Sequence, residues 1–270
     1  SQSLNQIIAS VVVELKAVLD DVRPDIVLVH GDTATSFAAG HGGALNPTDA
    51  VGISFWVISV AMVAATVFFL METQRVPDKW KTSMVVGALV TLVAAIHYFY
   101  MRDVWVATGE SPTVFRYVDW LITVPLQMIE FYLILSAVTA VAFGVFWRLL
   151  IGTLVMLLGG YLGEAGQIDA TVGFVIGMLG WFFILYEIFL GEASKISAND
   201  APASVQSAFS TMKWIVTIGW AIYPIGYAIG YLGGGMDGGS LNLIYNIADV
   251  INKIAFCLVI WACATSESRA

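Results

Sequence analysis

Several ionisable side chains stand inside long apolar stretches of the chain, among them Asp119, Glu130, Asp249 and Lys253. A charged side chain at membrane depth costs several kcal/mol, so one that is kept there usually faces the protein interior and marks a functional path. At about 100° per residue, five polar side chains of the segment 116–130 would share one helix face about 80° wide: Arg116, Asp119, Thr123, Gln127 and Glu130. The spacing therefore predicts one helix face that carries chemistry.

Asp119 and Glu130 are too far apart to act as a pair. They are 11 residues apart, which is about 16 Å along a helix axis, so they cannot share a proton directly. Glu130 has no basic residue within two helical turns, and such a carboxyl is expected to be protonated at neutral pH. The two acids could serve opposite halves of a proton pathway.

Lys253 follows Asp249 by four residues, which places both on one helix face about 6 Å apart along the axis. A buried lysine needs such a carboxylate. A desolvated lysine is also available to form a Schiff base with a carbonyl cofactor. The alternative is purely structural: Lys253 and Asp249 form a buried ion pair, and Asp119 pairs with Arg116 to hold helices together.

The composition places these residues in a membrane. The 270 residues are 59% hydrophobic and 12% charged, whereas soluble domains carry about 25% charged residues. The net charge is -8 and no run of Lys and Arg occurs, so nothing is present to neutralise phosphates and we expect no nucleic-acid partner. Nothing in the pattern indicates a metal site. The expected surroundings are a lipid bilayer.

Apolar segments of roughly 20 residues, each long enough to cross a bilayer, recur between breaker residues. They predict an all-α membrane protein, a seven-transmembrane-helix bundle, with spans near 50–72, 81–101, 113–138, 140–163, 171–190, 208–232 and 241–264. Basic residues predict the orientation. Arg102 falls on one side, and the other side holds Arg75, Lys79, Lys81, Arg148, Lys195, Lys213 and Arg269. The N-terminus is therefore expected outside and the C-terminus in the cytoplasm.

From about Gly43 onward the chain resembles the proteorhodopsins, a branch of the microbial rhodopsins. The resemblance rests on three motifs in the expected order: Arg116-Tyr-Val-Asp-Trp-Leu-Ile-Thr-Val-Pro125, Gly219-Trp-Ala-Ile-Tyr-Pro224 and Asn246-Ile-Ala-Asp-Val-Ile-Asn-Lys253. It implies all-trans retinal bound covalently to Lys253 in the bundle core. Trp120, Trp220 and Tyr223 look like the walls of a flat apolar slot for the polyene, with Pro224 beside them.

The resemblance also implies roles for the acids. Asp119 is the implied primary counterion and proton acceptor, Asp249 the second counterion, and Glu130 the cytoplasmic proton donor. Arg116 is similar to the family arginine that tunes the acceptor and gates proton release, the alternative being a helix anchor. The combination of Asp119, Thr123 and Glu130 is similar to the proton-pump pattern of the family.

Two further residues carry implied roles. His97 is similar to the family histidine that hydrogen-bonds the acceptor aspartate, although a lone histidine in a span is often a packing residue. Gln127 stands where green-absorbing relatives have leucine and blue-absorbing relatives have glutamine, so the resemblance implies blue absorption.

Pro125 and Pro224 lack an N–H group, and kinks are expected at both.

The expected function is therefore light-driven outward proton pumping in a bacterial inner membrane, as a transporter and not an enzyme. The protomers are expected to form a pentamer or hexamer, as is common in the family. The alternative is a slow-cycling sensory rhodopsin that signals through a partner. Sensory relatives typically carry an apolar residue at the donor position, which Glu130 occupies here.

Residues 1–42 have a different character from the rhodopsin-like domain, 43–270. An amphipathic helix is expected over residues 4–19 and a strand over 25–30. The stretch Val22–Thr35 faintly resembles a fragment of non-hydrolysing UDP-N-acetylglucosamine 2-epimerases, but it is too short to assemble a sugar-nucleotide site. We expect a fusion or gene-assembly join near Ser36 to Ala39.

Overall fold

The computed structural model describes residues 45–233 and 235–268. The chain divides into two units, 1–47 and Thr48–Ala270, and the second contains all the helices considered below. The helix predicted over residues 4–19, the strand over 25–30 and the join near Ser36 to Ala39 lie outside the described residues.

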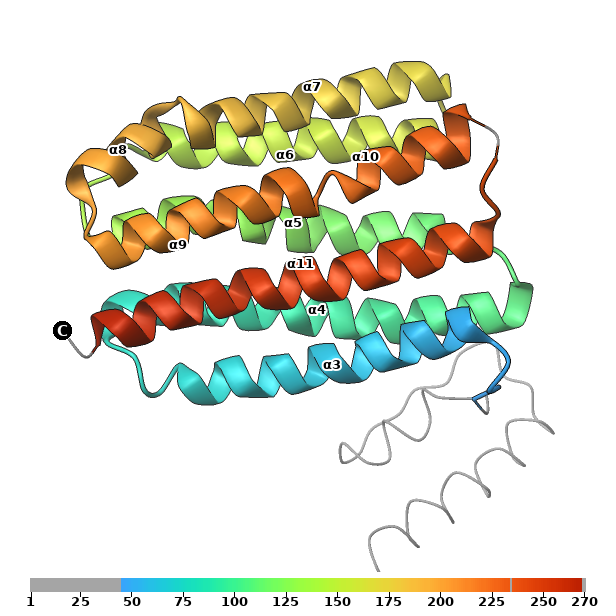
Figure 1. Cartoon of the computed structure of the whole chain (residues 1–270), viewed down its shortest axis with the longest axis horizontal. Coiled ribbons are helices and arrows are strands. Elements are labelled where there is room, and N and C mark those ends of the chain that lie inside the picture. Colours follow the sequence, from blue (N-terminus) through green and yellow to red (C-terminus); the bar gives the residue numbers. More distant parts are fainter. Residues whose placement is uncertain (1–44, 234, 269–270) are drawn as a thin grey trace, which may run out of the picture. The chain divides into compact units, whose positions relative to one another are not determined.

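Seven membrane-length apolar helices make up the described part of the second unit, as Figure 1 shows. The first four spans are α3 (Ala50–Glu72), α4 (Asp78–Thr108), α5 (Thr113–Ser136) and α6 (Phe143–Glu164). The fifth is α7 (Ala170–Phe189), continued by α8 (Glu192–Asp200), and the seventh is α11 (Gly238–Glu267). The prediction of a seven-helix, all-α bundle is confirmed.

The sixth span, Ala203–Leu232, is irregular. It consists of α9 (Ala203–Trp214), a π-helical segment (Ile215–Gly219), α10 (Ile222–Tyr227) and a second π-helical segment (Ala228–Leu232). The Trp220 N–H donates to the carbonyl of Ile215, five residues back, over 3.1 Å. The irregularity expected from Pro224 is therefore spread over two widened turns. At Pro125, by contrast, α5 continues as one helix.

Three spans are longer than the apolar runs that predict them. The second span reaches Asp78–Thr108 instead of 81–101, the sixth begins at Ala203 instead of 208, and the seventh reaches Gly238–Glu267 instead of 241–264. Backbone hydrogen bonds continue past the apolar core, because polar side chains at a helix end do not interrupt them. Hydropathy therefore underestimates the length of these helices.

The spans run up and down, so that each end of the bundle collects alternate helix ends. The helices α3, α7 and α11 begin at one end, where Asp49, Asp169 and Asp237 accept hydrogen bonds from the first backbone N–H groups. We call this the Asp49 end and the opposite one the Glu72 end. Hydrogen bonds from Ser240 lower the pKa of Asp237, which lies in the loop before α11.

Large apolar side chains cover the outside of the bundle, as with Ile218 and Leu179, which are 67% and 62% exposed. The interior holds polar groups instead: Asp119 and Thr123 are 0% exposed and Lys253 is 2% exposed. An apolar exterior fits a hydrocarbon solvent, and a buried polar interior is where a membrane protein carries its function.

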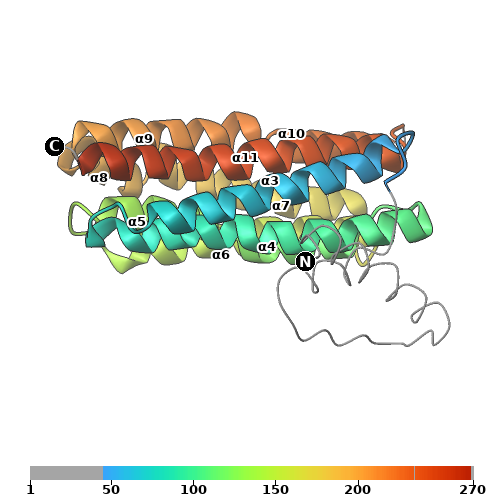
Figure 2. The ribbon, with the colours of Figure 1, turned by 90° about the horizontal axis from the view of Figure 1, so that it is seen from below.

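Glycines lie where helices α6 and α7 pack against each other. Figure 2 shows the bundle turned by 90° from the view of Figure 1. A Cβ atom added at Gly180 would lie 2.4 Å from the backbone nitrogen of Met156, and one at Gly173 would lie 2.6 Å from Cα of Gly163. Such contacts are shorter than any real Cβ contact. Small residues thus permit the backbones of these two helices to touch, as is common in membrane bundles.

The variant Gly180→Ala is therefore expected to destabilise the protein by about 1–3 kcal/mol, because the added methyl group overlaps backbone atoms that cannot move aside. The measurement is the thermal bleaching rate of the pigment in detergent. Gly238→Ala is the control, since nothing lies within 4 Å of a Cβ there. Equal bleaching rates for the two variants would contradict the close packing of α6 and α7.

Candidate functional site

Lys253 lies in the middle of α11 with its amine between two carboxylates. Nζ contacts Oδ2 of Asp119 on α5 at hydrogen-bonding distance and lies 3.0 Å from Oδ2 of Asp249 one turn earlier on α11. Asp249 is 1% exposed. The structure thus places one buried amine between two buried acids, so that a positive charge on Lys253 has a carboxylate partner on two sides.

The two carboxylates differ in their other partners. Asp249 accepts hydrogen bonds from the hydroxyls of Tyr98, at 2.7 Å, and Tyr223, at 2.6 Å. It also accepts the indole N–H of Trp120, at 3.1 and 3.2 Å to its two oxygens. Oδ1 of Asp119 has no hydrogen-bond partner among the described residues. Asp249 is therefore held as an anion on three sides, whereas Asp119 has an oxygen free to take a proton.

Thr123 lies one turn beyond Asp119 and is fully buried. Its hydroxyl donates to the backbone carbonyl of Asp119 over 3.0 Å. Thr123 therefore contacts the backbone of Asp119, not its carboxylate.

Arg116 points its guanidinium toward the Asp49 end and finds neutral partners. It donates to the side-chain oxygens of Asn242, at 2.7 Å, and Asn246, at 2.9 Å, and to the hydroxyl of Tyr98, at 3.2 Å. In the described part of the chain no ion pair joins Arg116 to Asp119. The purely structural alternative, in which these two residues pair to hold helices together, is not the arrangement found.

His97 is half-buried on α4, and its Nδ1 lies 2.9 Å from the carbonyl of Val93 in the previous turn. The hydrogen bond to Asp119 that the family resemblance implies is not among the bonds that the structure describes. Whether it forms in another state of the protein stays a prediction.

Glu130 lies on the same helix as Asp119, nearer the Glu72 end, and is 1% exposed. Neither of its carboxyl oxygens has a hydrogen-bond partner among the described residues. The hydroxyl of Ser83 on α4 lies close to the carboxyl. A buried carboxylate with no formed hydrogen bond is nevertheless costly when ionised, so the geometry favours a carboxyl that holds its proton.

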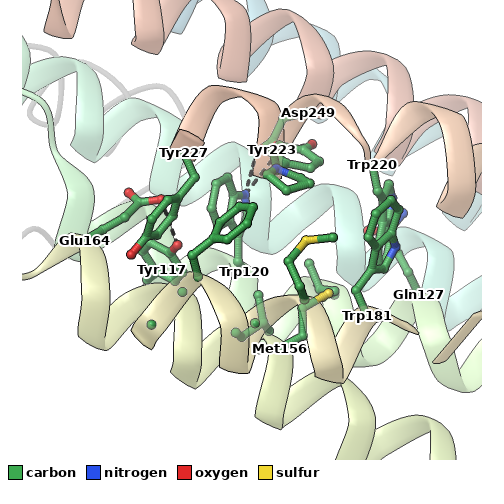
Figure 3. A pocket seen from close by; sticks show the side chains of 18 of the residues that line it. Tyr117, Trp120, Gln127, Met156, Glu164, Trp181, Trp220, Tyr223, Tyr227 and Asp249 are labelled. Atoms are coloured by element: carbon green, nitrogen blue, oxygen red, sulfur yellow. Dashed lines mark hydrogen bonds between the residues drawn. The ribbon is translucent and has the colours of Figure 1, made fainter. Parts of the chain in front are cut away.

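A cavity of about 100 Å³ opens beside Lys253, and Figure 3 shows its lining. All six residues predicted to bind the cofactor line it: Lys253, Trp120, Gln127, Trp220, Tyr223 and Pro224. Several of the lining rings also pack against one another: Trp120 and Tyr223 meet edge to face, with 5.1 Å between their centroids. The amide of Gln127 donates to the carbonyl of Asn252 over 3.3 Å, directly before Lys253. A long apolar molecule with a carbonyl end fits an aromatic cavity that contains one amine.

Several residues of the site were not predicted from sequence. Tyr98 binds both Asp249 and Arg116, and Asn242 and Asn246 hold the guanidinium. Met156 and Trp181 line the cavity. The asparagines offered a signal, because they are four residues apart and therefore share a face of the last span. The sequence contains no comparable signal for Met156 and Trp181, since large apolar residues in a span usually serve only to pack the helices.

Comparison with known proteins agrees with this geometry. The profile of the bacteriorhodopsin-like protein family matches residues 49–267. A green-light absorbing proteorhodopsin of Gamma-proteobacterium EBAC31A08 is 56% identical over 236 residues, which are 86% of this chain and 93% of that protein. A blue-light absorbing proteorhodopsin of Gamma-proteobacterium Hot 75m4 is 54% identical over 235 residues, 86% of this chain and 93% of that protein.

A solved structure gives the same result. The crystal structure of a blue light-absorbing proteorhodopsin from Med12 matches with a TM-score of 0.71 and 57% identity, over 81% of this chain and 100% of that one. The resemblance found in the sequence motifs is thereby confirmed. The chain belongs to the bacteriorhodopsin-like family, in its proteorhodopsin branch.

Proposed function

We propose that this protein is a light-driven outward proton pump that carries all-trans retinal as a Schiff base on Lys253. The observation that carries the proposal is the unequal pair of carboxylates around one buried amine. Asp249 is saturated with hydrogen bonds, and Asp119 keeps a free oxygen beside the same Nζ atom. One acid is thus fixed as a counterion and the other can accept the proton.

The cavity supplies the binding site for the cofactor. Trp120, Trp220 and Tyr223 would hold the polyene between their rings, and Lys253 would hold its carbonyl end. When bound, retinal supplies a light-driven isomerisation that reorients the N–H group at Nζ. The lining is mostly aromatic and apolar, which favours transfer of the proton on Nζ to the acids that Nζ contacts.

Each chain residue then has one task in proton transfer. Asp119 takes the proton from Nζ, because its Oδ2 already contacts that atom and its other oxygen is free. Glu130, on the opposite side of Lys253 along α5, returns a proton to Nζ and recovers one from the Glu72 end. Arg116, whose hydrogen-bond partners are neutral, presents a positive charge on the Asp49 side of the acceptor that favours movement of the proton toward that end.

The distribution of basic residues supports an orientation with the Glu72 end in the cytoplasm. Arg75, Lys79 and Lys81 follow the end of α3 there, and Lys195 lies in α8 at the same end. Arg102 lies in the other half of α4, and Arg269 is outside the described residues. This orientation puts the C-terminus inside a bacterial inner membrane and makes the proton move outward. We also propose that protomers assemble as a pentamer or hexamer, as the family resemblance implies.

The test is the external pH of illuminated cells that express the chain with added retinal, with and without a protonophore. Acidification that the protonophore abolishes supports outward pumping, and alkalinisation would contradict the direction. A pigment that forms without any pH change would favour the alternative, a sensory photoprotein.

Lys253→Ala is expected to form no pigment at all, because no other lysine of the described chain lines the cavity. The measurement is visible absorbance after retinal addition. Lys213→Ala, which removes a half-exposed lysine in α9, should leave the absorbance intact. A pigment in Lys253→Ala with a covalent retinal adduct would contradict the attachment site.

Gln127 supports blue absorption, since its amide lies in the cavity lining next to Lys253 and relatives with glutamine there absorb blue light. We expect Gln127→Leu to shift the absorption maximum to longer wavelength, while Gln127→Asn, which keeps an amide, shifts it less. The measurement is the visible spectrum of purified pigment. An unchanged maximum in Gln127→Leu would contradict the assignment.

A further inference from the structure

Glu164, the last residue of α6, is an acid of the site to which the mechanism above gives no task. It is partly buried at the Asp49 end and accepts a hydrogen bond from the hydroxyl of Tyr117 over 2.9 Å. It lines the same cavity as Lys253 and Asp249, and Figure 3 shows it beside Tyr117 and Tyr227 at the end away from Trp220. No basic side chain forms an ion pair with it among the described residues.

Tyr117 connects Glu164 to the centre of the site. Its ring lies edge-on against Trp120, 5.0 Å between centroids. The indole of Trp120 in turn donates to both oxygens of Asp249. A movement of Trp120, which forms a wall of the retinal cavity, therefore acts on Tyr117 and on the hydrogen bond that Tyr117 donates to Glu164.

The groups that face Glu164 come from several helices and are mostly neutral. From α5 come Tyr117 and the positive charge of Arg116, and from the sixth span comes Tyr231. Tyr245 of α11 and Tyr227 of α10 also lie within electrostatic range. Arg116 hydrogen-bonds to neutral groups. Among the described residues it is the cation whose charge acts on Glu164, and it can stabilise the carboxyl when the proton leaves.

We propose that Glu164 is the extracellular relay carboxyl, which receives the proton that leaves Asp119 and passes it to water at the Asp49 end. Tyr117 is the positioning residue that holds the carboxyl in place. In the first transfer the O–H bond of Asp119 breaks and one forms on Glu164, a step that requires water molecules to carry the proton between the two carboxyls. In the second, the O–H bond of Glu164 breaks and a water molecule at the Asp49 end takes the proton. The proposal rests on the pump function proposed above and adds the exit step of the pathway.

The experiment is flash spectroscopy of the retinal-loaded protein in lipid nanodiscs, with a pH-sensitive dye in the medium and infrared detection of carboxyl bands. In Glu164→Gln we expect proton release, and the return of Asp119 to the carboxylate, to slow by about 10²-fold, the usual contribution of a positioned acid–base group. Deprotonation of Nζ, which precedes this step, should keep its wild-type rate. Glu110→Gln, an exposed acid at the same end, is the control.

Two further variants keep the test decisive. Tyr117→Phe should shift the carboxyl band of Glu164 in the infrared spectrum and slow release by about 3–10-fold, for the loss of one hydrogen bond. Glu164→Asp retains an acid, so it should release its proton to the medium faster than Glu164→Gln. If Glu164→Gln forms no pigment, Tyr117→Phe is the variant that decides the test.

The outcomes separate this inference from the pump function. Wild-type release rates in Glu164→Gln, or in Tyr117→Phe if that variant decides, overturn the relay while pumping itself stands. Absence of any light-driven pH change in the wild-type protein overturns the pump function, and the relay falls with it.

Discussion

Replacing Asp119 by asparagine is expected to abolish light-driven acidification while the pigment still forms. Asp119 is the carboxyl that contacts Nζ of Lys253 and keeps one oxygen without a partner. An amide of the same shape removes the proton acceptor and leaves the cavity walls unchanged. The measurement is the initial rate of external pH change under light, normalised to pigment absorbance, and the expected value is zero within error.

Asp249→Asn is the matched comparison and should fail differently. Three donors converge on Asp249, from Tyr98, Tyr223 and Trp120, so an amide there leaves buried donors facing an NH2 group. Each buried donor left without an acceptor costs about 1–3 kcal/mol, a loss that Asp119→Asn does not share, and we expect lower pigment yield and faster thermal bleaching. If Asp119→Asn pumps at the normal rate, the acceptor role is wrong. If the two variants behave alike, the unequal roles of the two acids are wrong.

The second large effect is expected for Glu130→Gln. Return of a proton to Nζ should slow by about 10²–10⁴-fold, the range that positioned general acids contribute. The proton must then come from bulk water on the Glu72 side. In purified protein the rate should therefore fall tenfold for each unit rise in the pH of the medium, whereas the wild-type rate should depend little on pH near neutrality. The measurement is the recovery of visible absorbance after a laser flash.

Asp200→Asn serves as the control for Glu130→Gln, because Asp200 is an exposed acid at the end of α8 on the Glu72 side. It should recover as the wild-type protein does. A pH-independent, wild-type recovery in Glu130→Gln would mean that another group supplies the proton.

The spans could be predicted from the sequence because a bilayer demands a minimum run of apolar residues, and each run here is bounded by breakers. The ends of the helices could not. Residues such as Asp78 and Asp103 lie inside α4 but outside the apolar run, since polar groups at a helix end face water or headgroups at little cost. Hydropathy shows which residues lie in the hydrocarbon region of the bilayer, and it does not show how far the helix continues beyond that region.

The charged face of α5 could be predicted for a similar reason, because spacing along one helix fixes which side chains share a side. Contacts between helices depend on their rotation, which no spacing within one helix determines. The sequence therefore does not predict that Tyr98 donates a hydrogen bond to Asp249, although Tyr98 follows His97 directly in the chain. The hydrogen bond between His97 and the carbonyl of Val93, by contrast, joins residues four apart on one helix, which spacing along α4 allows.

The widened turn at Ile215–Gly219 has a consequence for comparing this chain with others. A turn that closes five residues back holds one residue more than an α-helical turn, so the two halves of the sixth span are out of phase by about 100°. Deleting one residue there would restore the phase and swing Tyr223 away from Asp249, which it now contacts at 2.6 Å. In an alignment without gaps, a relative that lacks this turn would match the chain on one side of it. On the other side its residues would be shifted by one position and would be compared with residues on a different helix face.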